Sequence, residues 1–389
     1  MKLIVLHDYF ESLEGGGRLS SLLAQGLSAD LGYGFARAGH PFLEERGKEK
    51  GERGSVQGER RKGATEEMNF SESSPLFPAQ HDLRAYSAIP LWRQFKLARA
   101  FAQRTAFLNH YDTVIYSGFY TPLAVRHHQQ GRNILYCHTP PRFIYDQRDF
   151  YLKRLPWFLR PALQAFIHYL QPRYEDAIAQ MDLLIANSEN VRQRIQHYLS
   201  KDAVIVYPPC DTARFVWQGQ GNYYLSMGRL DPLKRVDLII QAFLKMPQKR
   251  LIVASGGEEL QRLQRLANNA PHIRFTNWLD DTQLAALVGN AIATLYLPKD
   301  EDFGMSPLES MAAGKPVIGV AEGGLLETVI AEKTGILLEP PLSTAAICEA
   351  VEMMTPRRAL MMRRDCEMQA QRFRVEVFLE QMRQHNCKK

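Results

Sequence analysis

Short runs of β-branched and aromatic residues, separated by longer helical patterns, recur along the chain. Eleven such runs lie at residues 3–6, 113–118, 133–138, 183–188, 203–209, 223–228, 250–255, 272–277, 293–298, 316–320 and 335–339. Their apolar residues mostly run together instead of alternating with polar ones, as is typical of parallel strands whose sheet is covered by helices on both faces. The sequence therefore predicts an α/β fold.

The predicted strands are too many for one doubly wound sheet. Two prolines at 208–209 follow a strand and precede a second series of strands and helices. We therefore expect two Rossmann-like α/β domains with a cleft between them, since such sheets bind ligands at the carboxyl ends of their strands. The expected boundaries are residues 1–208 and 209–372. A helical stretch at 373–385 ends on the second domain or crosses back to the first.

Composition narrows the protein class. Hydrophobic residues make up 45% of the 389, which is enough for a sizeable core. No run approaches the ~18 apolar residues of a membrane span, and the opening residues MKLIVLHDYF resemble a buried strand more than a signal peptide. Five cysteines without a C-x-x-C pair fit a reducing cytoplasm and argue against structural zinc.

Residues 44–74 differ from the rest of the chain. Fifteen of these 31 residues are charged and five are glycine. Such a segment cannot bury enough apolar surface to offset the entropy lost on ordering. We expect a disordered insertion that carries no chemistry.

Two motifs carry groups suited to an anionic ligand. Gly15, Gly16 and Gly17 follow the first strand and precede a helical pattern, so their N–H groups form either an anion site or a simple tight turn. They do not spell G-x-G-x-x-G, which disfavours a nicotinamide dehydrogenase. Arg229 and Lys234 follow a later strand, either as solvated loop charges or as the cations that hold a diphosphate.

The stretch 301–319 contains two glutamates eight residues apart. Ser306, Pro307 and Glu309 read as an N-cap, a first helical proline and the closing residue of a capping box. Glu309 either caps its own helix or binds the hydroxyls of a ribose. Glu301 lies in a loop after a strand, where a ligand-binding role is favoured. His138 also ends a strand and is either structural or part of the same site.

These motifs together resemble glycosyltransferase family 4, the retaining GT-B enzymes. The resemblance rests on EDFGMSPLESMAAGKPVIG, GRLDPLKRVDLII, VYPPCDTARF and IANSENVRQRI, and it covers about residues 1–30 and 110–385. YCHTPPRFIYD is most similar to bacterial members that transfer mannose from GDP-mannose in surface-polysaccharide synthesis. One departure is Gly17-Arg18, where the family usually has a small residue and an acid.

The resemblance implies a role for each candidate residue. Arg229 and Lys234 would neutralise the donor diphosphate, Glu301 would bind the sugar hydroxyls, and His138 would lie beside the transferred sugar. The remaining donor-binding residues would be Gly15, Gly16, Gly17, Asn277, Phe303, Gly304, Met305, Ser306, Leu308 and Glu309. The resemblance implies no metal and no cofactor, because protein cations stabilise the leaving diphosphate.

Several alternatives stay open at this stage. A UDP-sugar is the second candidate donor, and a GT-B sugar-nucleotide epimerase is the nearest rival activity. Basic, aromatic stretches at 83–111 and 150–174 contain no acid, and they suit an anionic membrane surface as well as an ordinary core with solvated charges. The net charge of 48 − 42 = +6 alone suggests nucleic acid, but no recognised module accompanies it, so no nucleic-acid partner is expected. The expected partners are a nucleotide-sugar donor and a glycan or lipid-linked acceptor.

Overall fold

The computed structural model describes residues 2–11, 15–37, 39–43 and 77–387. The predicted insertion at 44–74 lies outside these residues. The described chain forms two compact units, residues 1–132 and 133–389. The predicted domain boundaries at 208/209 and 372/373 stay a prediction, because the division into compact units does not test them.

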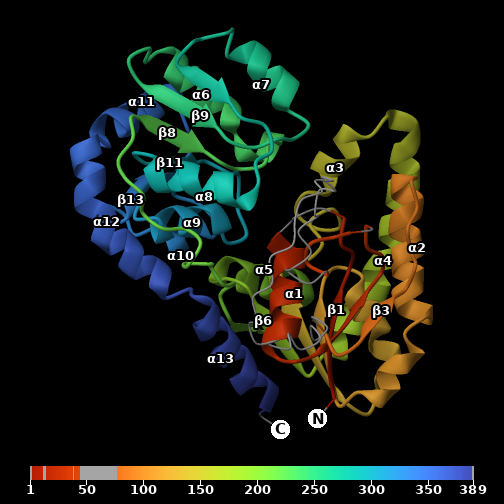
Figure 1. Ribbon diagram of the computed structural model, residues 1–389. Helices are drawn as coiled ribbons and strands as arrows, with labels where there is room; N and C mark the ends of the chain where they lie inside the picture. Colours follow the sequence, from red (N-terminus) through yellow and green to blue (C-terminus); the bar gives the residue numbers. More distant parts are fainter. Residues whose placement is uncertain (1, 12–14, 38, 44–76, 388–389) are drawn as a thin grey trace, which may run out of the picture. The chain divides into compact units, whose positions relative to one another are not determined.

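The strands form two sheets whose neighbouring strands pair in parallel in the described part of the chain (Figure 1). The first has the order β3-β2-β1-β4-β5-β6-β7 and the second the order β10-β9-β8-β11-β12-β13. The first sheet contains β1 (Leu3–His7), β2 (Asp30–Tyr33), β3 (Gln80–Asp82), β4 (Thr113–Ser117), β5 (Arg132–Cys137), β6 (Leu183–Ala186) and β7 (Val204–Ile205). The second contains β8 (Tyr223–Ser226), β9 (Arg250–Val253), β10 (Ile273–Phe275), β11 (Thr294–Tyr296), β12 (Val317–Val320) and β13 (Gly335–Leu338).

The predicted α/β fold with two Rossmann-like sheets is confirmed, and each of the eleven predicted strands is present. Two further strands, β2 and β3, were not predicted. Their sequences, DLGY and QHD, contain Gly, Asp and other polar residues that are depleted in strands. Strand β2 forms by pairing with β1, and β3 forms by pairing with β2, which is a tertiary effect.

Helices connect the strands. They are α1 (Gly15–Gly26), α2 (Pro90–Gln103), α3 (Arg148–Arg154), α4 (Arg160–Ala179), α5 (Glu189–Leu199), α6 (Val236–Leu244), α7 (Leu260–Leu266), α8 (Asp281–Asn290), α9 (Met305–Ala312), α10 (Leu325–Thr328), α11 (Thr344–Met353), α12 (Pro356–Gln371) and α13 (Val375–Cys387). Local signals set several of their ends. Ser188 caps α5, and Asp280 with Gln283 forms a capping box on α8. No helix in the described ranges combines the length and the apolar character needed to span a membrane.

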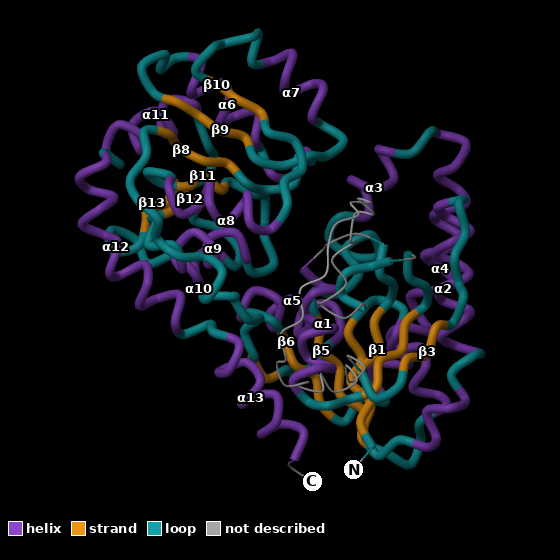
Figure 2. Tube along the Cα trace, in the orientation of Figure 1, coloured by secondary structure: helices purple, strands orange, loops and turns teal. Residues whose placement is uncertain are grey.

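Helices cover both faces of the second sheet (Figure 2). Successive residues of one strand point to opposite faces. Tyr224 of β8 lies in one apolar cluster with residues of α6, α11 and α12, whereas Leu225 lies in another with residues of α8. The sheet is therefore buried on both sides, and its ligand-accessible polar groups gather in the loops at its edges.

The last helix, α13, contacts a strand of the first sheet. The ring of Phe378 lies edge-on to that of Tyr136 on β5, with centroids 5.9 Å apart. Just before the helix, the N–H of Cys210 donates to the carbonyl of Phe373 over 2.6 Å. Helix α13 thus packs against β5, and Phe373 just before it bonds to the segment that follows β7.

Candidate functional site

Polar side chains gather after β8, β11 and β12, which are adjacent strands of the second sheet. Because parallel strands end at the same edge, the loops that follow them lie together. Lys234 follows β8, Glu301 follows β11, and Glu322 follows β12. This edge is the part of the second sheet best placed to hold an anionic ligand.

Lys234 and Glu301 form a largely buried ion pair. The Lys234 Nζ is 2.6 Å from Glu301 Oε2, and the two side chains are 18% and 19% exposed. The same ammonium donates to the Tyr296 hydroxyl over 2.9 Å. Burial alone disfavours the charged ammonium, but Tyr296 and Glu301 outweigh that cost and raise the pKa of Lys234 above its usual value. The site therefore contains a fixed positive charge.

Arg229 differs from Lys234 in its surroundings. Its side chain is 55% exposed, and its Nε lies 3.5 Å from Asp231 Oδ2. Asp231 also accepts a hydrogen bond from the Leu233 N–H over 2.9 Å, which starts the short helical turn Pro232–Lys234. The two predicted cations are thus one solvent-facing guanidinium and one enclosed ammonium on the same loop.

The predicted start of α9 is wrong. Ser306 was expected to be the N-cap, with Glu309 closing a capping box. The helix instead begins at Met305, and its N-cap is Gly304 in a left-handed conformation, with φ of 95°. A glycine adopts this φ without steric cost, so the chain enters the helix earlier than the Ser-Pro pattern suggests.

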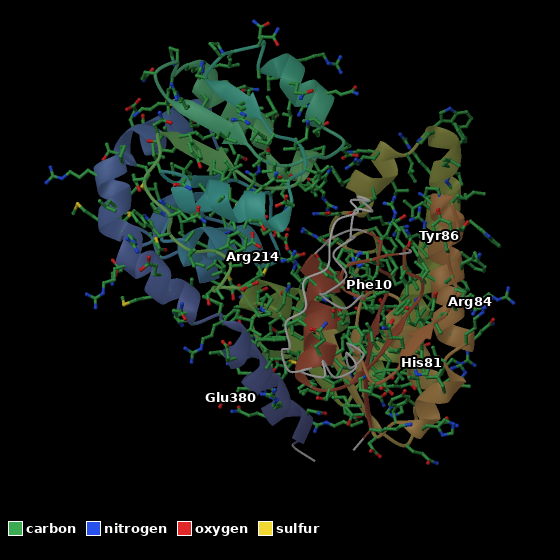
Figure 3. All side chains as sticks on the ribbon, viewed as in Figure 1. Phe10, His81, Arg84, Tyr86, Arg214 and Glu380 are labelled. Carbon is green, nitrogen blue, oxygen red and sulfur yellow. The ribbon has the colours of Figure 1, made fainter. Side chains whose placement is uncertain are left out.

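Glu309 consequently faces another partner. Its Oε1 lies 3.7 Å from Arg214 Nη2, and Arg214 also pairs with Asp281 over 2.5 Å. Figure 3 labels Arg214 among the side chains of the second unit. Sequence reasoning missed Arg214, because nothing in VYPPCDTARF indicates which acid it meets.

Two predicted donor-binding residues have core side chains. The Phe303 ring lies 5.5 Å from that of Tyr207 and 5.7 Å from that of Phe373, and Leu308 is fully buried. Only the backbone of these two residues is suited to a ligand. Gly304 is buried, whereas Met305 and Ser306 are half-buried at the helix start.

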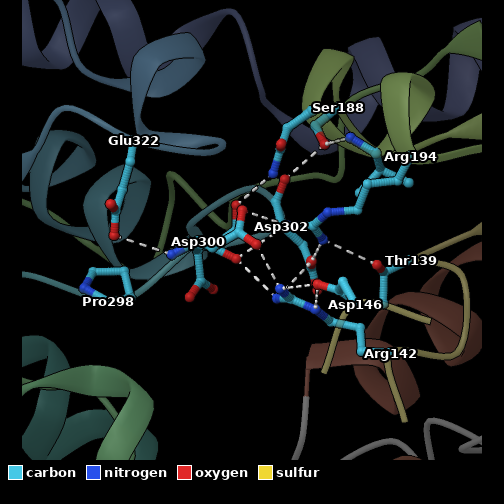
Figure 4. Close-up of polar contacts among 12 residues, drawn as sticks. Thr139, Arg142, Asp146, Ser188, Arg194, Pro298, Asp300, Asp302 and Glu322 are labelled. Atoms are coloured by element: carbon cyan, nitrogen blue, oxygen red, sulfur yellow. Dashed lines mark hydrogen bonds and ion pairs between the residues drawn. The ribbon is translucent and has the colours of Figure 1, made fainter. Parts of the chain in front are cut away.

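Two arginines from outside the second sheet form hydrogen bonds and ion pairs with the loop that carries Glu301 (Figure 4). Arg142, between β5 and α3, binds Asp146 and Asp300. Arg194 of α5 binds Thr139, Asp300 and Asp302. No local sequence pattern predicts these contacts, since each arginine is separated from its partner in the loop by more than 100 residues.

His138 and Asn277 lie at the ends of other strands. His138 directly follows β5 and is half-buried, with its ring centroid 5.4 Å from that of Tyr136. Asn277 follows β10 and is exposed, with φ of 58°. The neighbouring Trp278 is 69% exposed, and its indole Nε1 would lie 2.2 Å from a Cβ on Gly256. The absence of a side chain at Gly256 therefore admits this ring.

The three glycines at 15–17 form the first turn of α1 instead of a turn before it, which corrects the prediction. A Cβ on Gly17 would lie 3.3 Å from the Phe10 ring and 3.6 Å from His7 Nε2, whereas one on Gly15 would meet nothing within 4 Å. A side chain at Gly17 would therefore crowd the Phe10 ring, whereas one at Gly15 would meet open space. The glycines belong to the first unit and the other candidate residues to the second.

No cluster of three or more His, Cys, Asp or Glu side chains that could hold a metal ion occurs among the residues that the structure describes. Metal independence stays a prediction, because it concerns the reaction.

The part of the chain that carries the Lys234–Glu301 pair matches a known family. Residues 211–372 match the model described as glycosyl transferases group 1. A human protein named alpha-1,3/1,6-mannosyltransferase ALG2 is 25% identical over 287 residues, which cover 64% of this chain and 66% of that protein. The corresponding protein of Saccharomyces cerevisiae is also 25% identical, covering 57% and 53%. The chain thus spans about half to two thirds of the length of these relatives.

Solved structures share the whole architecture. Sucrose-phosphate synthase from Thermosynechococcus elongatus has a TM-score of 0.74 at 17% identity, covering 99% of this chain and 98% of that one. The Anabaena protein HepE in complex with UDP and glucose has a TM-score of 0.71 at 14% identity, and the match covers 100% of both chains. Likeness at these identities establishes the fold alone. The chain therefore has the GT-B fold, and its residues 211–372 are similar to the glycosyl transferases group 1 family.

Proposed function

We propose that this protein is a retaining, metal-independent glycosyltransferase that moves mannose from GDP-mannose to a glycan or lipid-linked glycan in polysaccharide or cell-envelope synthesis. The observation that carries the proposal is the buried Lys234–Glu301 pair at the carboxyl edge of the second sheet, inside the group 1 domain. The cation suits the diphosphate of a nucleotide sugar, and the neighbouring carboxylate suits the hydroxyls of its sugar.

Breaking the bond between sugar and phosphate builds negative charge on the leaving diphosphate. Fixed cations that need no reorganisation stabilise such charge, usually as the largest catalytic contribution. Lys234 supplies an enclosed cation, and Arg229 adds a solvent-facing one. The amino end of α9, opened by Gly304, adds backbone N–H groups and the positive end of a helix dipole.

The carboxylates take the hydroxyl-bearing parts of the donor. Glu301 exchanges its contact with Lys234 for the sugar hydroxyls when the diphosphate binds the ammonium. Glu309 holds the ribose, and His138 lies beside the sugar ring. The acceptor hydroxyl then attacks from the face that the phosphate leaves, and the leaving phosphate takes its proton, so the anomeric configuration is retained.

Mannose is proposed from the names of the relatives, which are mannosyltransferases, together with the YCHTPPRFIYD motif. A UDP-sugar is the second candidate donor. A sugar-nucleotide epimerase would return an altered nucleotide sugar instead of a glycoside, so analysis of the products separates it from a transferase.

A thermal-shift panel with GDP, UDP, ADP, CMP and NAD at matched concentrations tests the donor. A ligand at about 100 times its Kd stabilises a protein by about 2.7 kcal/mol. GDP alone is expected to raise the Tm. Stabilisation by UDP alone would contradict the GDP-mannose assignment, and no shift with any nucleotide would contradict the function itself.

Glu309→Ala should abolish the shift, because it removes the carboxylate proposed to bind the ribose. Glu349→Ala is the matched control, since Glu349 is exposed on α11 of the same domain. An unchanged Tm shift in Glu309→Ala would show that Glu309 pairs with Arg214 and does not bind the ligand.

We further propose peripheral contact with anionic membranes. Ile89 and Trp92 at the start of α2 are 65% and 53% exposed, and Trp157 and Phe158 between α3 and α4 are 78% and 62% exposed. Exposed basic residues accompany both pairs, with Arg99 on the helix of the first pair and Lys153 and Arg160 beside the second. Aromatic rings flanked by cations suit the interface of an anionic bilayer.

Flotation with vesicles containing phosphatidylserine tests this contact. The protein should float with the anionic vesicles and remain at the bottom with neutral ones. Trp157→Ser with Phe158→Ser should weaken flotation. Recovery of the wild-type protein only in the soluble fraction would rule out membrane contact.

A further inference from the structure

Three acidic residues in a row, Asp300, Glu301 and Asp302, form the loop after β11. Adjacent carboxylates repel one another, so this loop needs counter-charges to hold one shape. Its backbone is also constrained, because Asp300 has a left-handed φ of 52° that few non-glycine residues adopt. The surrounding structure must supply what keeps the loop in this conformation.

Every carbonyl of the loop accepts hydrogen bonds from residues that precede the second sheet in sequence. The Asp300 carbonyl accepts from Arg142 Nη1 over 2.8 Å and from Arg194 Nη2 over 3.1 Å. The Glu301 carbonyl accepts from Asn190 Nδ2 over 2.8 Å. The Asp302 carbonyl accepts from the Ser188 hydroxyl over 2.6 Å. Residues after β12 hold the backbone as well, because the Gly324 N–H donates to the Glu301 carbonyl over 2.9 Å and the Asp300 N–H donates to Glu322 Oε1 over 3.2 Å. The loop backbone is therefore fixed both by residues before the second sheet and by residues after β12.

The carboxylates of the two aspartates are held by the same two arginines. Asp300 lies 2.6 Å from Arg142 Nη2 and 2.7 Å from Arg194 Nη2, and Asp302 pairs with Arg194 Nη1. The arginine side chains are 13% and 10% exposed, whereas those of Asp300 and Asp302 are 45% and 31% exposed. The ion pairs are therefore partly buried, and solvent screens them less than pairs on the open surface.

The middle acid points elsewhere. Glu301 directs its carboxylate to Lys234, at 2.6 Å, while its two neighbours are turned to the arginines. We propose that Arg142 and Arg194 are positioning residues that aim Glu301 at Lys234 by holding Asp300 and Asp302. This inference rests on the proposed function, in which Glu301 and Lys234 contact the donor.

Arg194 is better suited to this role than a lysine. Its Nη1 donates to Thr139 and Asp302, and its Nη2 donates to the carbonyl and the carboxylate of Asp300. A planar guanidinium reaches several acceptors in fixed directions, whereas an ammonium acts as a point charge. Arg194→Lys should therefore keep the charge balance and lose part of the geometry.

The test compares Arg194→Gln with Arg192→Gln. Both arginines belong to α5, but Arg192 pairs with Glu189 and Asp202 at the surface and contacts no residue of the loop. Hydrogen–deuterium exchange of a peptide covering 299–305 reports loop order without any ligand. We expect faster exchange there in Arg194→Gln, wild-type exchange in Arg192→Gln, and an intermediate rate in Arg194→Lys.

Turnover of GDP-mannose gives the second readout. A misplacement of about 1 Å costs as much as about 100-fold in rate. Arg194→Gln should lower kcat by about that factor with little change in KM, and Arg194→Lys should recover part of it. Wild-type exchange at 299–305 in folded Arg194→Gln would overturn the inference, as would faster exchange throughout the chain.

The two proposals fail in different ways. If the wild-type protein binds no nucleotide, the proposed function is wrong, while the exchange experiment still tests whether Arg194 orders the loop. If Arg194→Gln does not fold, Arg142→Gln is measured in the same way, since Arg142 holds the same carbonyl and carboxylate of Asp300. Unchanged exchange in that variant also overturns the inference.

Discussion

At the residue scale, the Lys234–Glu301 ion pair is one that a bound ligand can replace. A buried ion pair gains little net stability over an apolar pair, but removal of one partner leaves an unpaired charge at a cost of several kcal/mol. A site that exchanges one counter-ion for another during binding can use such a pair, because the substrate diphosphate replaces the carboxylate without leaving the ammonium unpaired.

Lys234→Met should therefore abolish most of the activity. Loss of a preorganised group that stabilises transition-state charge costs about 100- to 1,000-fold in rate. The measurement is kcat/KM with GDP-mannose. Lys245→Met is the control, because Lys245 is an exposed residue just after α6 that donates to Thr344. Equal activity of the two variants would mean that Lys234 does not touch the diphosphate.

Gly304→Ala tests the start of α9. With φ of 95°, the position strains any residue that has a Cβ, and the added atom would lie 3.2 Å from the Leu325 side chain. A left-handed conformation costs an ordinary residue about 1–2 kcal/mol. Urea denaturation followed by circular dichroism should show that loss.

Gly15→Ala gives the matched comparison. A Cβ there meets nothing within 4 Å, and Gly15 has an ordinary helical position in the first turn of α1. Replacement of a helical glycine by alanine is favourable by about 0.5–1 kcal/mol. A loss of stability in both variants, or in neither, would contradict the conformational assignment of Gly304.

At the element scale, a buried lysine anchors the segment that leads into β8. Lys315 lies between α9 and β12 and is 1% exposed. Its ammonium donates to the carbonyl of Gly219 and lies 5.4 Å from the centre of the Trp217 ring. Arg363 of α12 lies 4.2 Å from the same ring. Two cations thus hold one tryptophan on the second sheet's domain.

Burial, followed by the nearby charge of Arg363, lowers the pKa of Lys315 from 10.5 to about 8. Between these values the unfolded chain binds more protons at this position than the folded one, so the contribution of Lys315 to stability rises with pH. Below pH 8 the Lys315 ammonium is charged in both states, so the full cost of burying that charge lowers the stability. Thermal melts from pH 8 to 10.5 should show a less positive slope of stability with pH in Lys315→Met than in the wild type. Identical slopes would contradict a lowered pKa.

At the scale of the whole molecule, α13 ties the chain end to the first sheet's strands. Phe378 is 1% exposed and packs against Tyr136 of β5. Removal of a buried phenylalanine side chain costs about 3–5 kcal/mol. Phe378→Ala should lower the free energy of unfolding by that amount, as measured by urea denaturation.

Glu380→Ala is the control for this prediction. Glu380 lies on the same helix, is exposed, and is labelled in Figure 3. Its replacement should leave stability unchanged. If Phe378→Ala were equally neutral, the helix would not be a packed part of the structure in solution.

The sequence predicted the strands of both sheets where apolar residues run together, because burial on both faces selects such runs. It failed for β2 and β3, whose polar residues become strand only because β2 pairs with β1 and β3 pairs with β2. It also failed at α9, where Ser306 and Pro307 carry a local capping pattern. The left-handed Gly304 overrides that pattern by starting the helix at Met305.

The sequence by itself determined the α/β class and the loops in which the charged residues lie, since both follow from local patterns of burial and from strand order. Tertiary structure decided the partners of those charges. Lys234 meets Glu301, Glu309 meets Arg214, and Arg194 meets Asp300 and Asp302. The partners are 67 to 108 positions apart in the sequence. Coulombic attraction acts through space, and only the folded chain brings such distant positions together.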